Sequence, residues 1–320
     1  MKKIFFAVVA VVAMTACAKE DIVREAPRQA IGFGELFVDN ATRAVDNSYS
    51  SSNLPASFKV YGTVTGNTTP ANTLNIFNGV EVFQSSEGHE IGTENTWWYD
   101  QEYVQYWIAG ATYNFAAVVG ATVGATDKDA NGMPTKLNTV ADTNMHFQDM
   151  LYDVTPVTGV TKNYNTPVAF DFQHLLSKVM FTVNSTATGN YKHSVTNITV
   201  SNYTSGTYDI ASKSWSGTAG NVSFGKIENV TATSTDAQKT SAFEKLLIPT
   251  TASFTVSFTV TTYNGNTPMG TENVGPITIT QDLEAANAYN FIINCEVGAP
   301  ITFTFNSVGG WGTEQDITVQ

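Results

Sequence analysis

Four histidines are the side chains of this sequence best suited to acid–base or metal chemistry, namely His89, His146, His174 and His193. None of them lies in an H-E-x-x-H motif, and none has a second histidine at metal-ligand spacing. The nearby serines lack the glycine-flanked turn that makes serine a nucleophile in hydrolases. The sequence therefore predicts structural or surface histidines, with no metal site, no cofactor and no catalytic residues. An enzyme of unfamiliar type is the least favoured of three functional hypotheses.

One short acidic segment matches the opening of a calcium-binding loop. Asp127, Asp129, Asn131 and Gly132 have the required spacing. The twelfth position is Asn138, where such loops use a glutamate that binds calcium through both oxygens. A polar hairpin turn is therefore the preferred interpretation, and calcium binding is the alternative.

A cluster of aromatic residues could stack against sugar rings. Its members are Trp97, Trp98, Tyr99, Tyr103, Tyr106 and Trp107. In a β protein such residues more often pack in the core. The second functional hypothesis is therefore a monomeric, surface-exposed glycan-binding lipoprotein that would use Trp97, Trp98 and Trp107.

The N-terminus has the pattern of a secretory signal. Lys2 and Lys3 precede an apolar run from Ile4 to Met14, and small residues follow directly before Cys17. The run is shorter than the roughly 20 residues that a membrane-spanning helix needs. We therefore interpret residues 1–16 as a cleaved signal peptide.

Cys17 follows Met-Thr-Ala, which resembles the lipobox of bacterial lipoproteins. The resemblance implies that Cys17 is acylated, with palmitate among its chains, and anchors the protein to the outer membrane. Each buried CH₂ contributes about 0.8 kcal/mol, so several chains make the attachment permanent. Lys19, Glu20 and Asp21 look like a signal for export to the cell surface, and a solvated tether is the alternative. The other cysteine, Cys295, shares the parity of an apolar strand and is predicted to be a buried, unreactive thiol.

Length and charge limit the remaining possibilities. Cleavage after residue 16 leaves 304 residues and takes the formal charge from −12 to −14, because Lys2 and Lys3 are lost. Such an acidic chain is a poor partner for nucleic acid or anionic membranes. Its length predicts two domains.

Period-two alternation dominates the chain after residue 50 and predicts an all-β fold. Phe254, Val256, Phe258 and Val260 alternate with hydroxyl residues, and two other segments, 179–183 and 301–305, do the same. We expect two tandem antiparallel β-sandwich domains at 45–165 and 166–320. Residues 17–44 would form a lipidated leader.

Several motifs, in order and spacing, resemble those of the fimbrillin family. Residues 106–117 resemble its Y-W-x-x-G-x-x-Y-x-F-x-A strand, and residues 149–152 and 170–179 resemble its D-x-L-Y and F-x-F-x-H-x-L-x-K-V signatures. Residues 283–291 and 303–311 are similar to its closing strands. The resemblance implies two transthyretin-like sandwich domains in a surface lipoprotein that forms the stalk, anchor or tip of fimbriae. It also implies that other fimbrial subunits are partners, with a host or bacterial receptor or glycan as a further one.

In polymerising members of that family, an arginine-specific protease removes the leader with the first strand, and a strand of the next subunit replaces it. Here arginine occurs only at positions 24, 28 and 43, whereas ten lysines follow Arg43. We therefore predict cleavage between Arg43 and Ala44, with a lysine-preferring genome as the alternative explanation. Ile31, Phe33 and Phe37 would belong to the removable strand, and its loss would expose a sheet edge. Whether the short segment from Ile317 to Val319 is donated or internal stays open. A fimbrial subunit or adhesin is the first functional hypothesis.

Overall fold

The computed structural model describes residues 29–38, 54–66, 71–92, 97–235, 238–239 and 244–308. Strands and turns make up this part of the chain, and helical structure is confined to short turns such as η1 (Gln101–Tyr103) and η2 (Ala125–Asp127). The predicted all-β class is confirmed. None of the helical segments described is long and apolar enough to cross a membrane.

The N-terminal half is built on one six-stranded sheet. Its strands run in the order β1 (Phe33–Val38), β7 (Val168–His174), β6 (Leu151–Val157), β4 (Thr112–Val119), β2 (Ser57–Thr65) and β3 (Thr73–Phe83). All neighbours are antiparallel except β1 and β7, which are parallel. Parallel partners cannot be joined by a tight hairpin, and β1 and β7 are indeed far apart in the sequence.

The two edges of this sheet meet through a short segment at Trp97 and Trp98. The Trp98 N–H donates to the carbonyl of Phe83 at the end of β3 (2.9 Å), and the Phe83 N–H donates to the Trp98 carbonyl (2.7 Å). The Trp97 N–H donates to the carbonyl of Phe33 at the start of β1 (3.1 Å). The sandwich predicted for this half therefore takes the form of a rolled sheet, which β1 and residues 97–98 close.

The C-terminal half is a sandwich of two sheets. One contains β10 (Ser214–Val230), β9 (Tyr191–Asp209), β12 (Phe254–Asn264) and β13 (Thr267–Ile279), and the other contains β11 (Glu244–Leu247), β8 (Ser177–Ser185), β14 (Ala288–Cys295) and β15 (Thr302–Val308). Inward-facing Val, Ile and Phe side chains of both sheets share one core. The β8–β14 pair is parallel and the other pairs are antiparallel.

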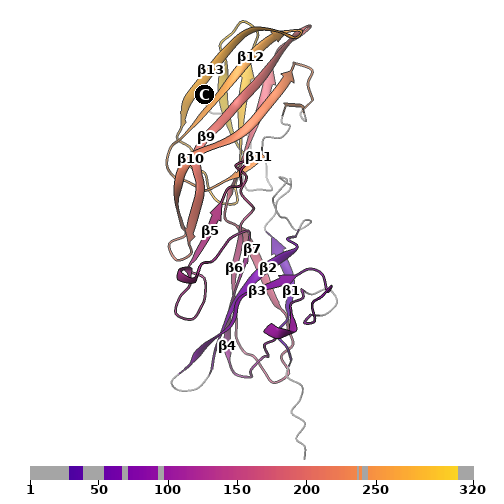
Figure 1. Ribbon diagram of the computed structural model, residues 1–320, viewed down its shortest axis with the longest axis vertical. Helices are drawn as coiled ribbons and strands as arrows, with labels where there is room; N and C mark the ends of the chain where they lie inside the picture. The colour runs from indigo at the N-terminus through magenta and orange to yellow at the C-terminus, as the bar shows by residue number, and fades with distance from the viewer. Residues whose placement is uncertain are drawn as a thin grey trace, which may run out of the picture.

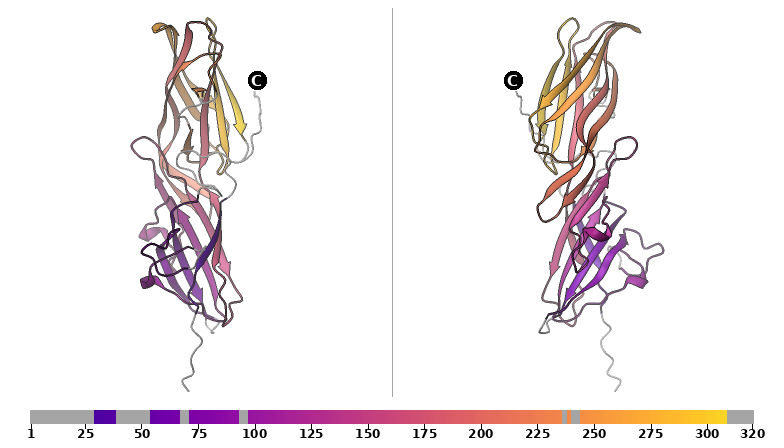
Figure 2. Two further views of the ribbon diagram at one scale, coloured as in Figure 1. Left: turned by 90° about the vertical axis from the view of Figure 1, so that its right-hand side faces the viewer. Right: turned by 60° about the vertical axis from the view of Figure 1, so that its left-hand side comes forward.

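The halves are stacked end to end along the long axis of the molecule (Figure 1). The β9–β10 hairpin extends beyond the sandwich toward the N-terminal half (Figure 2), where β5 (Lys136–Val140) pairs with β9. A buried apolar cluster with members from both halves fills this junction: Tyr61, Ala116, Val118, Leu137, Phe147, Met150, Leu175, Leu176, Leu246 and Ile248.

The change from one half to the other falls later than the sequence indicated. We predicted a boundary between residues 165 and 166, but β7 still belongs to the N-terminal sheet. The chain enters the C-terminal sandwich at Ser177, three residues after β7 ends at His174. The prediction failed because β7 and β8 have the same alternating pattern, and only their hydrogen-bond partners distinguish them.

Candidate functional site

The candidate site is the place of β1 in the N-terminal sheet, because the chain forms hydrogen bonds on both sides of it. On one side the Val168 N–H donates to the Gly32 carbonyl (2.8 Å), and β7 continues the pairing. On the other side the Ile31 N–H donates to the Gln105 carbonyl (2.8 Å), and the Trp107 N–H donates to the Gln29 carbonyl (3.1 Å). Residues 29–33 are thus held between two backbone edges.

Phe33 lies at the centre of the rolled sheet and is fully buried. Its ring contacts five other aromatic rings, with centroid distances from 5.6 to 6.3 Å: Phe58, Phe77, Tyr99, Phe115 and Phe170. Four of these rings come from β2, β3, β4 and β7, one from each strand. Gly62 makes room for them, since a Cβ there would lie 3.0 Å from both Phe77 and Phe115. We call the space enclosed by these five rings the Phe33 socket.

The other side chains of this segment follow a shifted pattern. Ile31, Leu36 and Val38 are buried, whereas Phe37 is 53% exposed. Phe37 lies in β1, the strand to which we assigned it together with Ile31 and Phe33, but its side chain is exposed. The pairing with β7 is irregular between Phe33 and Leu36, and such an irregularity adds one residue and reverses the parity of the residues that follow.

Tyr99 was not identified from the sequence as part of this site. Its hydroxyl donates to the Ile31 carbonyl (2.7 Å), and its side chain is buried against Phe33 and Phe77. Burial raises the pKa of this hydroxyl well above 10, so it stays a hydrogen-bond donor at neutral pH. No sequence signal could have revealed this contact, which joins residues 68 positions apart.

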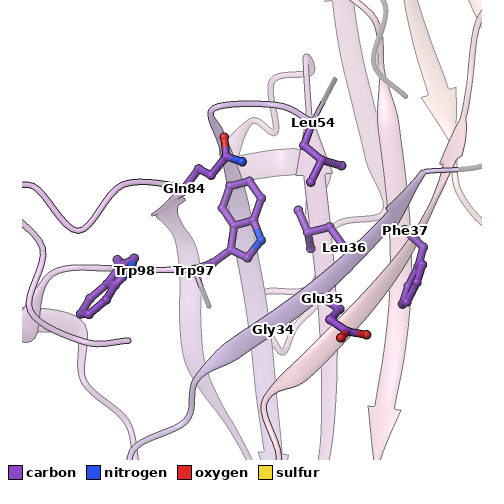
Figure 3. A pocket seen from close by; sticks show the side chains of 8 residues that line it. All are labelled: Gly34, Glu35, Leu36, Phe37, Leu54, Gln84, Trp97 and Trp98. Carbon is purple, nitrogen blue, oxygen red and sulfur yellow. The ribbon is translucent and has the colours of Figure 1, made fainter. Parts of the chain in front are cut away.

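The second half of β1 borders an open pocket of about 620 Å³ (Figure 3). The described lining residues outside β1 are Leu54, Gln84, Trp97 and Trp98, and none of them belongs to β7. Leu36 points toward Leu54 and Trp97, while Phe37 lies on the other side of the β1 ribbon. Residues 34–38 therefore have a strand partner on one side and a pocket on the other.

The three tryptophans proposed for sugar stacking do not form one exposed platform. Trp97 is 5% exposed and packs on Phe58, and Trp107 is 7% exposed and packs on Tyr113, Phe115 and Tyr164. Only Trp98 is partly exposed. Two of the three indoles thus belong to the core, and they could stack on a sugar only if that core opened.

All four histidines make ordinary structural contacts. His89 stacks on Phe83 and contacts Asp100, and the surface residue His146 lies near Asp142. The other two are buried: Nδ1 of His174 lies 3.0 Å from Asp149, and Nδ1 of His193 lies 2.8 Å from the Ser185 hydroxyl. Burial lowers the pKa of His193.

The acidic loop is a tight turn whose carboxylates are engaged locally. Asp127 accepts hydrogen bonds from the Gly124 N–H (3.0 Å) and the Asn138 amide (2.7 Å). Asp129 accepts from the backbone N–H groups of Asn131 and Met133. The described residues contain no group of three or more His, Cys, Asp or Glu side chains arranged to hold a metal ion.

Cys295 lies on the inward face of β14, as its parity predicted, and is a buried free thiol. Burial, assisted by Glu272, raises its pKa to about 12. The other predicted site residues, Cys17, Lys19, Glu20, Asp21, Arg43 and Ala44, lie outside the described residues, as does the segment 317–319.

Comparison with known proteins tests the resemblance seen in the motifs. The model of a family described as fimbrillin-like matches residues 42–311, which is most of the chain. The chain belongs to the fimbrillin-like family. This fimbrillin-like chain has its β1 outside the matched range, which begins four residues after Val38. No curated protein matches its sequence.

Solved structures share the fold of this fimbrillin-like chain at low sequence identity. A fimbrial protein from Bacteroides vulgatus has a TM-score of 0.56 at 16% identity, and the match covers 88% of this chain and 99% of that one. A candidate cell adhesion protein from Bacteroides ovatus has a TM-score of 0.53 at 15% identity, with 91% and 100% covered. At such identities the likeness establishes the fold alone.

Proposed function

We propose that this protein is a structural or adhesive subunit of cell-surface fimbriae and is exported as a lipoprotein anchored through Cys17. Lys19, Glu20 and Asp21 direct it to the outer face of the outer membrane. A protease then cuts between Arg43 and Ala44 and removes β1. A strand of the next subunit fills the groove, and repetition of this step builds the polymer.

The observation that carries this proposal is the place of β1 in the rolled sheet. The strand closes the sheet, yet in the sequence it precedes all the other strands that the structure describes and is separated from β2 by residues 39–56, which include Arg43. One cut after Arg43 therefore disconnects β1 and leaves every other strand in a single chain. The family match agrees with this division, since it starts at residue 42 and leaves β1 out.

The groove would bind a replacement strand strongly. Four side chains of this segment, Ile31, Phe33, Leu36 and Val38, are buried. At roughly 1.5 to 3 kcal/mol each, their burial contributes on the order of 10 kcal/mol before the cost of ordering the strand. Backbone hydrogen bonds on both sides fix the register of the added strand. An interaction of this strength supports a polymer that dissociates rarely.

The names of the structural neighbours agree with this role. The Bacteroides vulgatus protein is called a fimbrial protein, and the Bacteroides ovatus protein is associated with cell adhesion. Other fimbrial subunits are therefore the proposed partners of this chain, with a host or bacterial surface receptor as a further one for an adhesive subunit.

The test is cleavage of the purified full-length protein with an arginine-specific protease. Mass spectrometry should show one large fragment that begins at Ala44, because no arginine follows residue 43. Gel electrophoresis should then show multimers that resist SDS. Arg43→Lys should abolish both results, whereas Arg28→Lys should abolish neither. A body that is degraded, or trimmed but strictly monomeric, would contradict the proposal.

The lipid anchor has a separate test. The wild-type protein should fractionate with membranes, and the intact mass of a form that retains residue 17 should include acyl chains on Cys17. Cys17→Ala should move the protein to the soluble fraction. An unmodified Cys17 in membrane-bound protein would refute the anchor and leave the strand replacement standing.

A further inference from the structure

The groove that β1 occupies is lined by residues that would all stay behind after cleavage. The five rings of the Phe33 socket belong to residues 58 to 170, and so do the backbone groups that hold residues 29–33 from either side. Whatever replaces β1 meets the same walls. The contacts between β1 and those walls therefore indicate which side chains an incoming strand needs at each position.

The first requirement is an aromatic ring at the place of Phe33. The rings of Phe33 and Phe170 are stacked at 21° and 6.1 Å, whereas Phe58 and Phe115 meet the Phe33 ring edge-on. Such pairs stabilise packing beyond the area they bury, and an aliphatic side chain cannot form them. A smaller side chain would also leave a cavity in the middle of the sheet.

The second requirement concerns the residue directly after the ring. A Cβ at Gly34 would lie 2.9 Å from the Cβ of Pro167, which is closer than such atoms approach, whereas a Cβ at Gly32 would have no neighbour within 4 Å. Pro167 is a rigid residue next to β7 and cannot move aside as a flexible side chain could. Glycine is therefore needed after the ring but not before it.

The remaining positions divide into two classes. Leu36 and Val38 are buried, so apolar side chains are required three and five residues after the ring. Glu35 and Phe37 are exposed, so the groove places no demand on the residues two and four after it. The groove thus accommodates a strand with the sequence aromatic–Gly–x–apolar–x–apolar.

We propose that the Phe33 socket, together with Pro167, selects the strand that replaces β1. The occupant is a strand of another fimbrial subunit that presents a phenylalanine-sized ring followed directly by glycine, with apolar residues three and five positions later. This selectivity rests on the strand replacement proposed above. It makes the socket the part of the groove that sets both register and partner choice.

The experiment uses full-length protein cut with an arginine-specific protease, with cleavage after Arg43 verified by mass spectrometry. Fluorescent peptides with the sequence of residues 29–38 are added, and their uptake is measured by anisotropy in competition with one another. The wild-type peptide should bind. Phe33→Ala should weaken binding at least about 100-fold, and Phe33→Leu and Gly34→Ala at least about tenfold. The matched control Phe37→Ala should stay within about threefold of wild type.

The outcomes separate this proposal from the one on which it rests. If the wild-type peptide binds and Phe33→Leu or Gly34→Ala binds equally well, strand replacement stands and the selectivity is refuted. If no peptide binds, the wild-type peptide included, strand replacement itself fails and the selectivity fails with it. A Phe37→Ala peptide weakened as much as Phe33→Ala would refute the assigned register.

Discussion

Among the strands that the structure describes, two strands, β1 and β5, pair only with partners that are distant in the sequence. β1 pairs with β7, more than 100 residues later, and closes the N-terminal sheet. β5 leaves the N-terminal half and pairs with β9 of the C-terminal sandwich, with Leu137 opposite Tyr208. Both strands bury apolar side chains at places where two parts of the chain meet.

The strands differ in how the chain holds them. β5 lies between β4 and β6, so it remains attached at both ends and close to β9 whatever happens at the N-terminus. β1 has one connection to the rest of the fold, through the residues that contain Arg43. A cut there makes its rebinding a reaction between two molecules, whereas β5 stays at a high effective concentration. Similar pairing can therefore be exchangeable in one region and permanent in another.

The largest expected effect concerns the centre of the exchangeable region. Phe33→Ala should destabilise the N-terminal half of the intact protein by about 3 to 5 kcal/mol, because it removes a fully buried ring from the middle of the sheet. Urea denaturation followed by tryptophan fluorescence measures the change. The matched control Phe37→Ala should change stability by less than about 0.5 kcal/mol. Equal effects of the two variants would contradict the assigned facing of β1.

A substitution in β5, which stays attached to the chain at both ends, should have a different effect. Leu137→Ala should cost about 2 to 5 kcal/mol and weaken the contact between the halves, since Leu137 is fully buried in the junction cluster. Calorimetry should then resolve two transitions that lie closer together in the wild type. Val140→Ala, at a position 71% exposed on the same strand, is the control. Unchanged coupling in Leu137→Ala would show that β5 does not join the halves energetically.

A smaller effect should come from the Tyr99 hydroxyl, which donates a hydrogen bond to the backbone just before β1. Tyr99→Phe leaves the buried Ile31 carbonyl without this donor and should cost about 1 to 3 kcal/mol while β1 is bound. After cleavage and removal of β1 the difference between the two proteins should disappear. A difference that persists would mean that Tyr99 acts through some other contact.

The same residue predicts a dependence on alkaline pH. The pKa of Tyr99 in the folded chain is raised by burial above its ordinary value of 10.0, so the unfolded chain loses this proton first. The stabilisation is fully present below pH 10 and is lost as the pH rises above it. Urea denaturation at pH 8 and pH 11 measures the change. The free energy of unfolding should fall less between these two pH values in Tyr99→Phe than in the wild type.

The smallest expected change is in the C-terminal core. Cys295 is buried and its pKa is raised to about 12, so a thiol reagent at pH 8 should label it only when the sandwich opens. Cleavage after Arg43 and loss of β1 should leave this labelling rate unchanged. A marked increase would show that the C-terminal half depends on β1, which would contradict the separation of the two regions.

Local pattern was enough to predict much of the molecule. The alternation of Phe254, Val256, Phe258 and Val260 identified a half-buried strand, and all four side chains are buried in the C-terminal core. Cys295 was placed correctly by its parity alone. The same rule applied to β1 would place Phe37 on the buried face with Ile31 and Phe33, but an irregularity in the β1–β7 pairing shifts the parity and leaves no mark on the hydrophobic pattern.

The sequence by itself determined the β class, the family and the position of the only arginines, because these depend on residue types and short spacings. Only the tertiary structure decided that β1 closes a rolled sheet and that five rings surround Phe33. It also decided that Pro167 leaves room for no side chain larger than that of glycine at position 34. These features join residues up to about 140 positions apart. Periodicity records which side of a strand is buried, but it does not record which other strand lies against it.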